Sequence, residues 1–386
     1  MHLFNIPIEF ILFALTLFGV AVFHRRNLEI AVGGLLLLVL YKAAFTHLDL
    51  AAHVMHEERL VLNLLGLLLG FAILARHFEL SQVPEWLPRF LPDDWKGGFL
   101  LLVMVAVLSS FLDNIAAAMI GGVIAGHVFR HNVSTGYLAG IVAASNAGGA
   151  GSVIGDTTTT MMWVAGVPAM HVAEAAIASA VAVLFFGVLL GKAQHRHQPI
   201  VKNPPAGLKI DFGHLAVVGL MIAGTIAANV LLDFPAAGLW AALVFGHFIR
   251  KTPWMEAFRA LKGALFLIAL VLAASLMPVS ELPEPSPHTT LGLGFVSAVF
   301  DNIPLTALAL FQGGYDWGLL AFAVGFGGSM IWFGSSAGVA ISNLYPKAKN
   351  TGHWIIQGWP VAVGYVLGFA ALYLLLGWHP DPLPVK

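Results

Sequence analysis

The stretch "SSFLDNIAAAM", residues 109–119, places an aspartate next to an asparagine in the middle of an apolar run. Within residues 97–129, Asp113 is the only acid or base apart from His127. A carboxylate is costly to bury inside a membrane span, so such a residue is a functional candidate by default. The fold depends on how the chain accommodates Asp113, and the function depends on what Asp113 binds.

The overall composition is that of a membrane protein. The chain has 386 residues, of which 59% are hydrophobic and 10% charged, and its mean hydropathy is +0.85. Soluble domains carry about 25% charged residues. The composition therefore predicts an all-α polytopic protein, multi-pass in a cell membrane and in contact with lipid, and we expect the bacterial inner membrane. The net charge of -1 gives no reason to expect a nucleic-acid partner, and the absence of Cys excludes disulfides and thiolate metal ligands.

Apolar runs of membrane-spanning length occur throughout the chain. A helix needs about 20 apolar residues to cross the hydrocarbon core. Full spans are therefore expected at residues 6–23, 28–46, 59–76, 172–191, 213–232, 236–249, 257–277 and 353–377. Four other stretches carry polar residues at their centres. Two of them contain an Asp-Asn pair, 97–129 and 285–315, and two are rich in Gly, Ser and Thr, 132–170 and 317–346.

The two stretches with an Asp-Asn pair are predicted to be re-entrant hairpins. A straight helix over 97–129 would be about 50 Å long, against a hydrocarbon core of about 30 Å. Split at Asp113, each arm reaches about 24 Å, so the chain can enter, turn at depth and leave on the same side. With both hairpins and an outer N-terminus, all 19 Lys and Arg residues except Lys42, Arg59 and Lys386 lie inside, as the positive-inside rule favours.

The sequence around Asp113 recurs in the second half of the chain. The segment "SAVFDNIPLTA", 297–307, matches it at four pairs of positions, Ser109/Ser297, Asp113/Asp301, Asn114/Asn302 and Ile115/Ile303. A second pair of segments follows, "GGAGSVIGD" at 148–156 and "GGSMIWFGS" at 327–335. Both read Gly-Gly, five residues, Gly, and then a residue that can cap a helix. These matches indicate an internal repeat.

Each repeat is predicted to contain three spans, a re-entrant hairpin, a broken span and a final span. The number of crossings is odd, so the two repeats face opposite sides of the membrane. We expect one inverted repeat at 1–191, a cytoplasmic linker at 192–211 and the second inverted repeat at 212–386. Inverted repeats with broken helices are a transporter architecture in which substrate sites lie at the breaks.

The first broken span contains glycines and a candidate cap. Four glycines are expected to supply backbone conformations that a helix forbids, and they are Gly148, Gly149, Gly151 and Gly155. Asp156 is placed to be the N-cap of the helix that follows. Asp113 and Asn114 could also be caps and nothing more. A serine or threonine would cap a helix without burying a charge, so we favour a ligand role in addition.

The charges in the breaks favour a cation as substrate. Three carboxylates lie there, Asp113, Asp156 and Asp301, and no Lys or Arg lies at comparable depth. Such a site repels anions and attracts a proton or a small cation, and hard cations take oxygen ligands. Burial and a neighbouring like charge both favour the protonated form of a carboxylate. One site can therefore hold a proton and a metal ion in turn, which is the chemistry of an exchanger.

Three segments give the chain a family resemblance. "SSFLDN", "SNAGGAGSVIGDTTTTMMW" and "GSSAGVAISN" resemble segments of the NhaD-type sodium/proton antiporters, within the ion-transporter superfamily that also holds citrate, dicarboxylate and arsenite carriers. The resemblance covers about residues 100 to 350. It departs from the family pattern at Ser152-Val153, where the family usually has Ser-Pro.

The resemblance implies a function and a set of residues. It implies exchange of sodium or lithium for protons by alternating access, with a transport domain moving against a scaffold, commonly in a homodimer. The positions that match residues needed for exchange are Asp113, Asn114, Asn146, Asp156, Thr158, Thr159, Ser297, Asp301, Asn302, Ser335 and Ser336. Sodium would bind at these same residues, with no transition metal and no cofactor.

Other functions remain open at this point. A sodium-coupled carrier for citrate or another dicarboxylate is the first alternative, and an arsenite or other oxyanion exporter is the second. Both would need an anion-binding pocket, which the three buried aspartates disfavour. A non-transporting membrane scaffold would leave the repeated breaks unexplained. All the transport readings describe a transporter and not an enzyme.

Overall fold

The computed structural model describes the chain except for residues 1, 4–5, 24–25, 47–49, 202–208 and 382–386. Apart from one antiparallel pair of two-residue strands, β1 (His2–Leu3) and β2 (Ile6–Pro7), its regular elements are helices. The prediction of an all-α polytopic membrane protein is confirmed at this level. Six of the described helices are long and apolar enough to cross a membrane, α2, α3, the α9–α10 segment, α11, α13 and α19.

The first part of the chain contains helices of very different length. In order they are α1 (Ile8–Val22), α2 (Asn27–Phe45), α3 (Leu50–Leu80), α4 (Val83–Trp86), η2 (Leu87–Phe90), α5 (Trp95–Ser109), α6 (Asn114–Val128), α7 (Thr135–Ala150), α8 (Thr157–Val164), α9 (Ala169–Ala173) and α10 (Ala175–His197). Helix α5 is separated from α6 by residues 110–113, and α7 from α8 by residues 151–156, at the two places where the sequence predicts breaks.

The second part follows a similar order. Its helices are α11 (Phe212–Leu232), α12 (Pro235–Gly246), α13 (Met255–Ser275), η3 (Val279–Glu281), α14 (Pro287–Ser297), α15 (Asn302–Gln312), α16 (Trp317–Gly327), α17 (Ser336–Leu344), η4 (Pro346–Lys349), α18 (Thr351–Gln357) and α19 (Trp359–Leu376). Two predicted spans are shorter than the sequence suggests, because the apolar parts of α1 and α12 cover only residues 8–20 and 235–246.

The chain turns back on itself at both Asp-Asn pairs. The hydroxyl of Tyr137 donates to the carbonyl of Gly98 at 2.6 Å, and its ring packs edge-on against Phe129 at 5.2 Å between centroids. The start of α5 and the end of α6 therefore lie at one end. In the second half, Gln312 Nε2 at the end of α15 donates to the carbonyl of Pro283, just before α14, at 2.9 Å.

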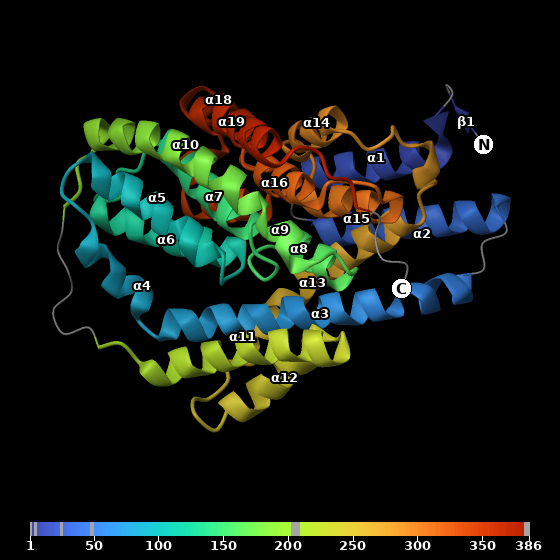
Figure 1. Ribbon diagram of the computed structural model, residues 1–386, viewed down its shortest axis with the longest axis horizontal. Coiled ribbons are helices and arrows are strands. Elements are labelled where there is room, and N and C mark those ends of the chain that lie inside the picture. Colours follow the sequence, from blue (N-terminus) through green and yellow to red (C-terminus); the bar gives the residue numbers. More distant parts are fainter. Residues whose placement is uncertain (1, 4–5, 24–25, 47–49, 202–208, 382–386) are drawn as a thin grey trace.

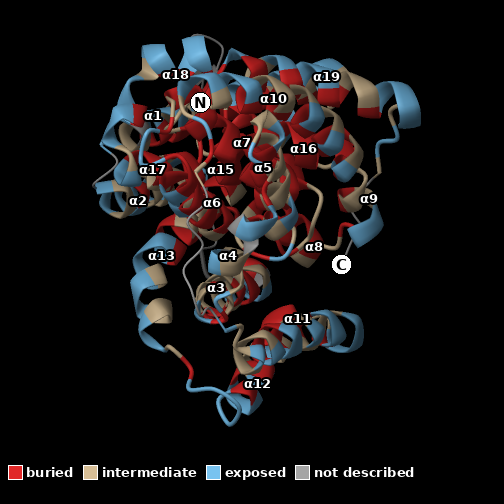
Figure 2. Ribbon diagram, turned by 90° about the vertical axis from the view of Figure 1, so that its left-hand side faces the viewer, coloured by how far each residue is buried: buried red, intermediate tan, exposed pale blue. Residues whose placement is uncertain are grey.

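Two half-length helices form the centre of the core. Every residue of α7 and of α16 is buried, and both helices are built largely from Gly, Ala and apolar side chains that allow close packing. Figure 2 shows this buried centre, with α10, α19 and α18 towards its outside. Helices α11 and α12 lie on the far side of α3 from the hairpins (Figure 1). The broken helices are thus enclosed by protein, which irregular backbone at membrane depth requires.

Candidate cation-binding site

The two Asp-Asn turns have the same backbone geometry. Asp113 is the N-cap of α6 with φ -53° and ψ 141°, and Asp301 is the N-cap of α15 with φ -54° and ψ 141°. Their side chains differ in what they do. The carboxylate of Asp301 accepts a hydrogen bond from the Ile303 amide at 3.1 Å, whereas Asp113 accepts no side-chain capping bond. The cap is therefore well formed at Asp301 and weaker at Asp113, whose carboxylate lies near the backbone amides of Asn114 and Ile115.

The two broken spans also resume in the same way. Asp156 is the N-cap of α8 with φ -142° and ψ 145°, and Ser335 is the N-cap of α17 with φ -143° and ψ 154°. The Asp156 carboxylate accepts from the Thr158 amide at 2.9 Å, and the Ser335 hydroxyl accepts from the Gly338 amide at 3.3 Å. The expected caps at both positions are confirmed. The second break has a hydroxyl where the first has a carboxylate.

Glycines allow the two chain segments on either side of each break to approach each other closely. A Cβ on Gly149 would lie 2.7 Å from the Gly155 carbonyl oxygen, and a Cβ on Gly328 would lie 2.6 Å from that of Gly334. A Cβ on Gly155 would collide with the carbonyl of Ser109 at the hairpin turn. Of the four glycines expected to leave the helical conformation, Gly151 and Gly155 lie in the non-helical break, whereas Gly148 and Gly149 are still part of α7. None of the four has a positive φ, so at Gly149 and Gly155 it is lack of space for a Cβ that requires glycine.

A chain of buried side chains surrounds Asp156. One carboxylate oxygen accepts from the backbone amide and, at 3.1 Å, from the hydroxyl of Thr158. The other accepts from Asn114 Nδ2 at 3.0 Å. Asn114 Nδ2 also donates to Asn146 Oδ1 at 3.1 Å. Both amide protons of Asn114 are used, so its own carbonyl oxygen is left for another partner.

The larger cavity at the site has a volume of about 470 Å³. Its polar lining comes from both halves of the chain and includes Asp113, Asn114, Asp156, Asn302 and Ser336. The remaining wall is mainly apolar and is supplied by α3, α6 and α13. Among the described residues that line it, none is Lys, Arg or His. The cavity therefore presents the carboxylates of Asp113, Asp156 and Glu79 and several neutral oxygens, with no basic side chain among its described lining residues.

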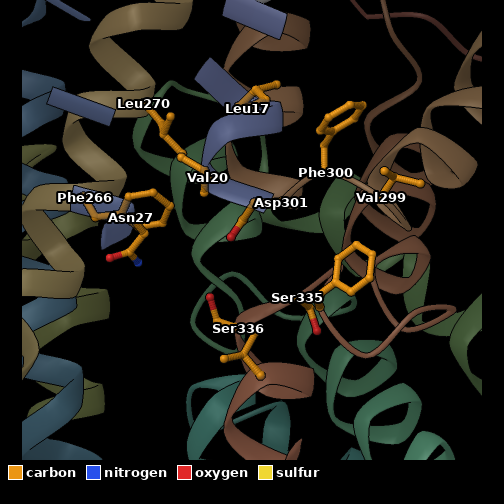
Figure 3. Close-up of a pocket in the computed structure, with 12 residues that line it drawn as sticks. Leu17, Val20, Asn27, Phe266, Leu270, Val299, Phe300, Asp301, Ser335 and Ser336 are labelled. Carbon is orange, nitrogen blue, oxygen red and sulfur yellow. The ribbon is translucent and has the colours of Figure 1, made fainter. Parts of the chain in front are cut away.

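A smaller cavity of about 140 Å³ lies beside the second break. Figure 3 shows Asp301, Ser335 and Ser336 around it, with Asn27 and Phe266 on the opposite side. Asn27, Phe266 and Ser336 line both cavities, so the two spaces adjoin. In the part of the chain that the structure describes, no three His, Cys, Asp or Glu side chains gather to hold one metal ion. Asp301 lines the smaller cavity, and Asp113 and Asp156 line the larger one.

The other expected site residues lie behind the cavities. Thr158 and Asn146 contact the carboxylate network directly or through Asn114. Thr159 instead donates to the backbone carbonyls of Ser152 at 2.6 Å and Asp156 at 2.9 Å, which ties the break together. Ser297 is fully buried, donates to the Val324 carbonyl at 2.8 Å and lines neither cavity.

Five polar residues of the site were not anticipated. Asn27 lines both cavities, Glu79, Thr157 and Thr160 line the larger one, and Ser329 accepts from Asn146 Nδ2 at 3.0 Å. Ser329 and the two threonines had a local signal, since they lie within segments that the sequence analysis singled out. Asn27 and Glu79 come from the ends of α2 and α3, and nothing in their sequence neighbourhood connects them with the breaks.

Comparison with known proteins gives a consistent set of relatives. No family model matches the chain. It is 29% identical over 381 residues to sodium/proton antiporter 1 of Arabidopsis thaliana, which covers 86% of this chain and 64% of that protein. It is 26% identical over 328 residues to the Na(+)/H(+) antiporter NhaD of Vibrio parahaemolyticus, covering 70% and 78% respectively. The chain thus spans less than two thirds of the length of the plant relative.

Proposed function

We propose that this chain, a relative of the NhaD-type sodium/proton antiporters, exchanges sodium or lithium for protons across a cell membrane by alternating access. The observation that carries the proposal is the pairing of Asp113 and Asp156 on one cavity without a basic side chain among its described lining residues. The relatives named sodium/proton antiporters support it independently. The bacterial inner membrane and a homodimeric assembly are part of the proposal.

The cavity lies on the inner side of the proposed topology. Glu79 lies one residue before the end of α3, and its side chain is 38% exposed. Asn27 and Ala260 lie near the starts of α2 and α13. The positive-inside rule places all three helix ends in the cytoplasm. In this proposal the cavity connects the two carboxylates to the cytoplasmic side, as expected for an inward-facing state.

Contacts between distant segments support the proposed repeats, at 1–191 and 212–386, and their hairpins. The inner ends assigned to α3 and α13 are joined by Arg76 and Glu256 at 3.9 Å. The outer ends assigned to α3 and α11 are joined by Arg59, which donates to the Asp233 carbonyl at 3.0 Å. Each contact joins ends that the inverted topology places on the same side of the membrane.

The amide of Asn114 provides a physical reason for competition between the two ions. An ionised Asp156 only accepts hydrogen bonds, so Asn114 turns its amide protons towards Asp156 and leaves its carbonyl oxygen for a cation. A protonated Asp156 can donate to Asn114 instead. Asn146 then turns with it, so that Asn146 Nδ2 donates to Asn114 and the Ser329 hydroxyl donates to Asn146. The amide group of Asn114 then faces the cavity in place of its carbonyl oxygen, so proton binding at Asp156 weakens sodium binding.

The test is cation-driven proton movement by the purified chain in liposomes. The liposomes carry a pH gradient, acidic inside, that a trapped pH-sensitive dye reports. Added sodium or lithium should dissipate this gradient, and potassium and choline serve as controls. Exchange should saturate with sodium and should weaken as the pH falls, because protons compete for the same carboxylates. A chain that inserts correctly but moves no protons with any of these cations would refute the proposal.

The carboxylate-carrier alternative makes a different prediction for the same assay. Citrate or another dicarboxylate would have to enter a cavity whose described lining offers two aspartates and no basic group. The carboxylates of the substrate and those of the two aspartates would repel each other strongly in a cavity from which water is excluded. Addition of citrate should therefore leave sodium-driven proton movement unchanged.

A further inference from the structure

Ser329 is a second-half residue that reaches the first-half site. It lies in the break after α16, and its side chain is fully buried. Its hydroxyl accepts from Asn146 Nδ2 at 3.0 Å. Its backbone carbonyl accepts from the indole of Trp354, in α18, at 3.2 Å. Ser329 is thereby held through both its hydroxyl and its backbone carbonyl, and its hydroxyl lies against Asn146 of α7.

The hydrogen bonds beyond Ser329 form one continuous chain. Asn146 gives its amide protons to Ser329 and its carbonyl oxygen to Asn114. Asn114 in turn donates to Asp156. The direction of every bond follows from the carboxylate, which can only accept. Four side chains from the hairpin, α7, the α8 cap and the second break thus fix one another.

We infer that Ser329 is a positioning residue of the cation site, through which the second half of the chain orients Asn146 and Asn114 over Asp156. This inference rests on the proposed function. Asn114 lines the larger cavity, and its carbonyl oxygen is free because both amide protons are used. Without an acceptor at Ser329, the buried amide of Asn146 lacks a partner and turns to find one. Asn114 then loses its fixed orientation and the cation loses a well-placed oxygen.

The consequence is a change in cation affinity more than in turnover. A buried donor left without an acceptor costs roughly enough to change an equilibrium tenfold. We therefore expect Ser329→Ala to raise the half-saturating sodium concentration about tenfold, while the maximal exchange rate of the folded protein changes less than about twofold. Ser329→Thr keeps the hydroxyl and should return the half-saturating concentration close to that of the parent protein.

Ser145 provides a matched control. It precedes Asn146 on α7 and is also fully buried, but its hydroxyl donates to the Val142 carbonyl of its own helix at 2.9 Å. Ser145→Ala also removes a fully buried hydroxyl, next to Asn146 in the chain, but it leaves the hydrogen bonds between Ser329, Asn146, Asn114 and Asp156 intact. Its half-saturating sodium concentration should stay within about twofold of the parent.

The experiment is sodium-driven proton movement in liposomes, together with equilibrium binding of radioactive sodium to the purified full chain. If Ser329→Ala folds poorly, Ser329→Cys supplies a side chain of similar shape with a weak acceptor, and the same rise in half-saturating sodium is expected. A purely structural role would reduce the yield of folded protein without changing the affinity of the folded fraction. Parent-like affinity in both variants would overturn the inference, whereas absence of exchange in the parent protein would overturn the proposed function.

Discussion

Replacement of Asp156 by asparagine tests the site most directly. Asparagine retains the carbonyl oxygen that accepts from the Thr158 amide, so the cap of α8 survives. It also places an NH₂ group where the carboxylate accepts from Asn114 Nδ2 at 3.0 Å. Two donors then face each other in a buried space. The substitution therefore removes the ionisable group and disrupts the chain of amides, while the helix start is kept.

The size of the effect follows from the bonds that are lost. A hydrogen bond to a charged group contributes about 1.5–3 kcal/mol. Asp113→Asn also removes one carboxylate from the cavity, but it breaks no capping bond. Each variant gains stability because one charge less is buried, so this gain partly cancels when the free energies of unfolding of the two variants are compared. We expect Asp156→Asn to be less stable than Asp113→Asn by about 1.5–3 kcal/mol. Both should lose cation-driven proton exchange.

A second substitution should restore the stability. In the Asn114→Asp, Asp156→Asn double variant, the new carboxylate accepts from the amides at 156 and 146, and the Ser329 hydroxyl can donate to Asn146. The double-mutant cycle should give a favourable coupling of about 1–3 kcal/mol. Unfolding can be followed by the fluorescence of the 10 Trp residues in detergent, and exchange in liposomes.

Two results would refute this reasoning. Exchange at the parent rate in well-folded Asp113→Asn and Asp156→Asn proteins would show that these aspartates serve only to cap helices. Absence of coupling in the double-mutant cycle would show that the amides of Asn114 and Asn146 are not oriented by the carboxylate.

Three further predictions concern the second break, the topology and the inner surface. Asp301→Asn keeps its bond to the Ile303 amide and lies on the smaller cavity, so liposome assays should find a reduced exchange rate and not its loss. Single cysteines at Lys96 and Arg130 should be labelled from the cytoplasmic side and one at Glu284 from outside; labelling of the first two from opposite sides contradicts the hairpin. Hydrogen bonds from Arg250 lower the pKa of Asp211 below its usual 3.8. The ionised Asp211 therefore stabilises the fold fully above pH 3.8, and this stabilisation is lost as the pH falls through the lowered pKa. Asp211→Asn should accordingly lower the unfolding temperature at neutral pH, and the difference from the parent should vanish in strong acid.

The sequence alone determined the class of protein and the positions of its breaks. Apolar composition depends only on residue type, and helix caps depend on residues within one turn of each other. The turns at Asp113 and Asp301 and the caps at Asp156 and Ser335 could therefore be predicted from local patterns. The matching order of the two halves was visible for the same reason.

Only the tertiary structure decided which of these groups act together. The pairing of Asp113 with Asp156 on one cavity, and of Asp301 with Ser335 on another, depends on how α3 and α13 pack against the hairpins. The contact of Ser329 with Asn146 joins residues 183 positions apart. A pattern of neighbouring residues carries no information about such distances, because the space that a side chain faces is set by segments remote in the chain.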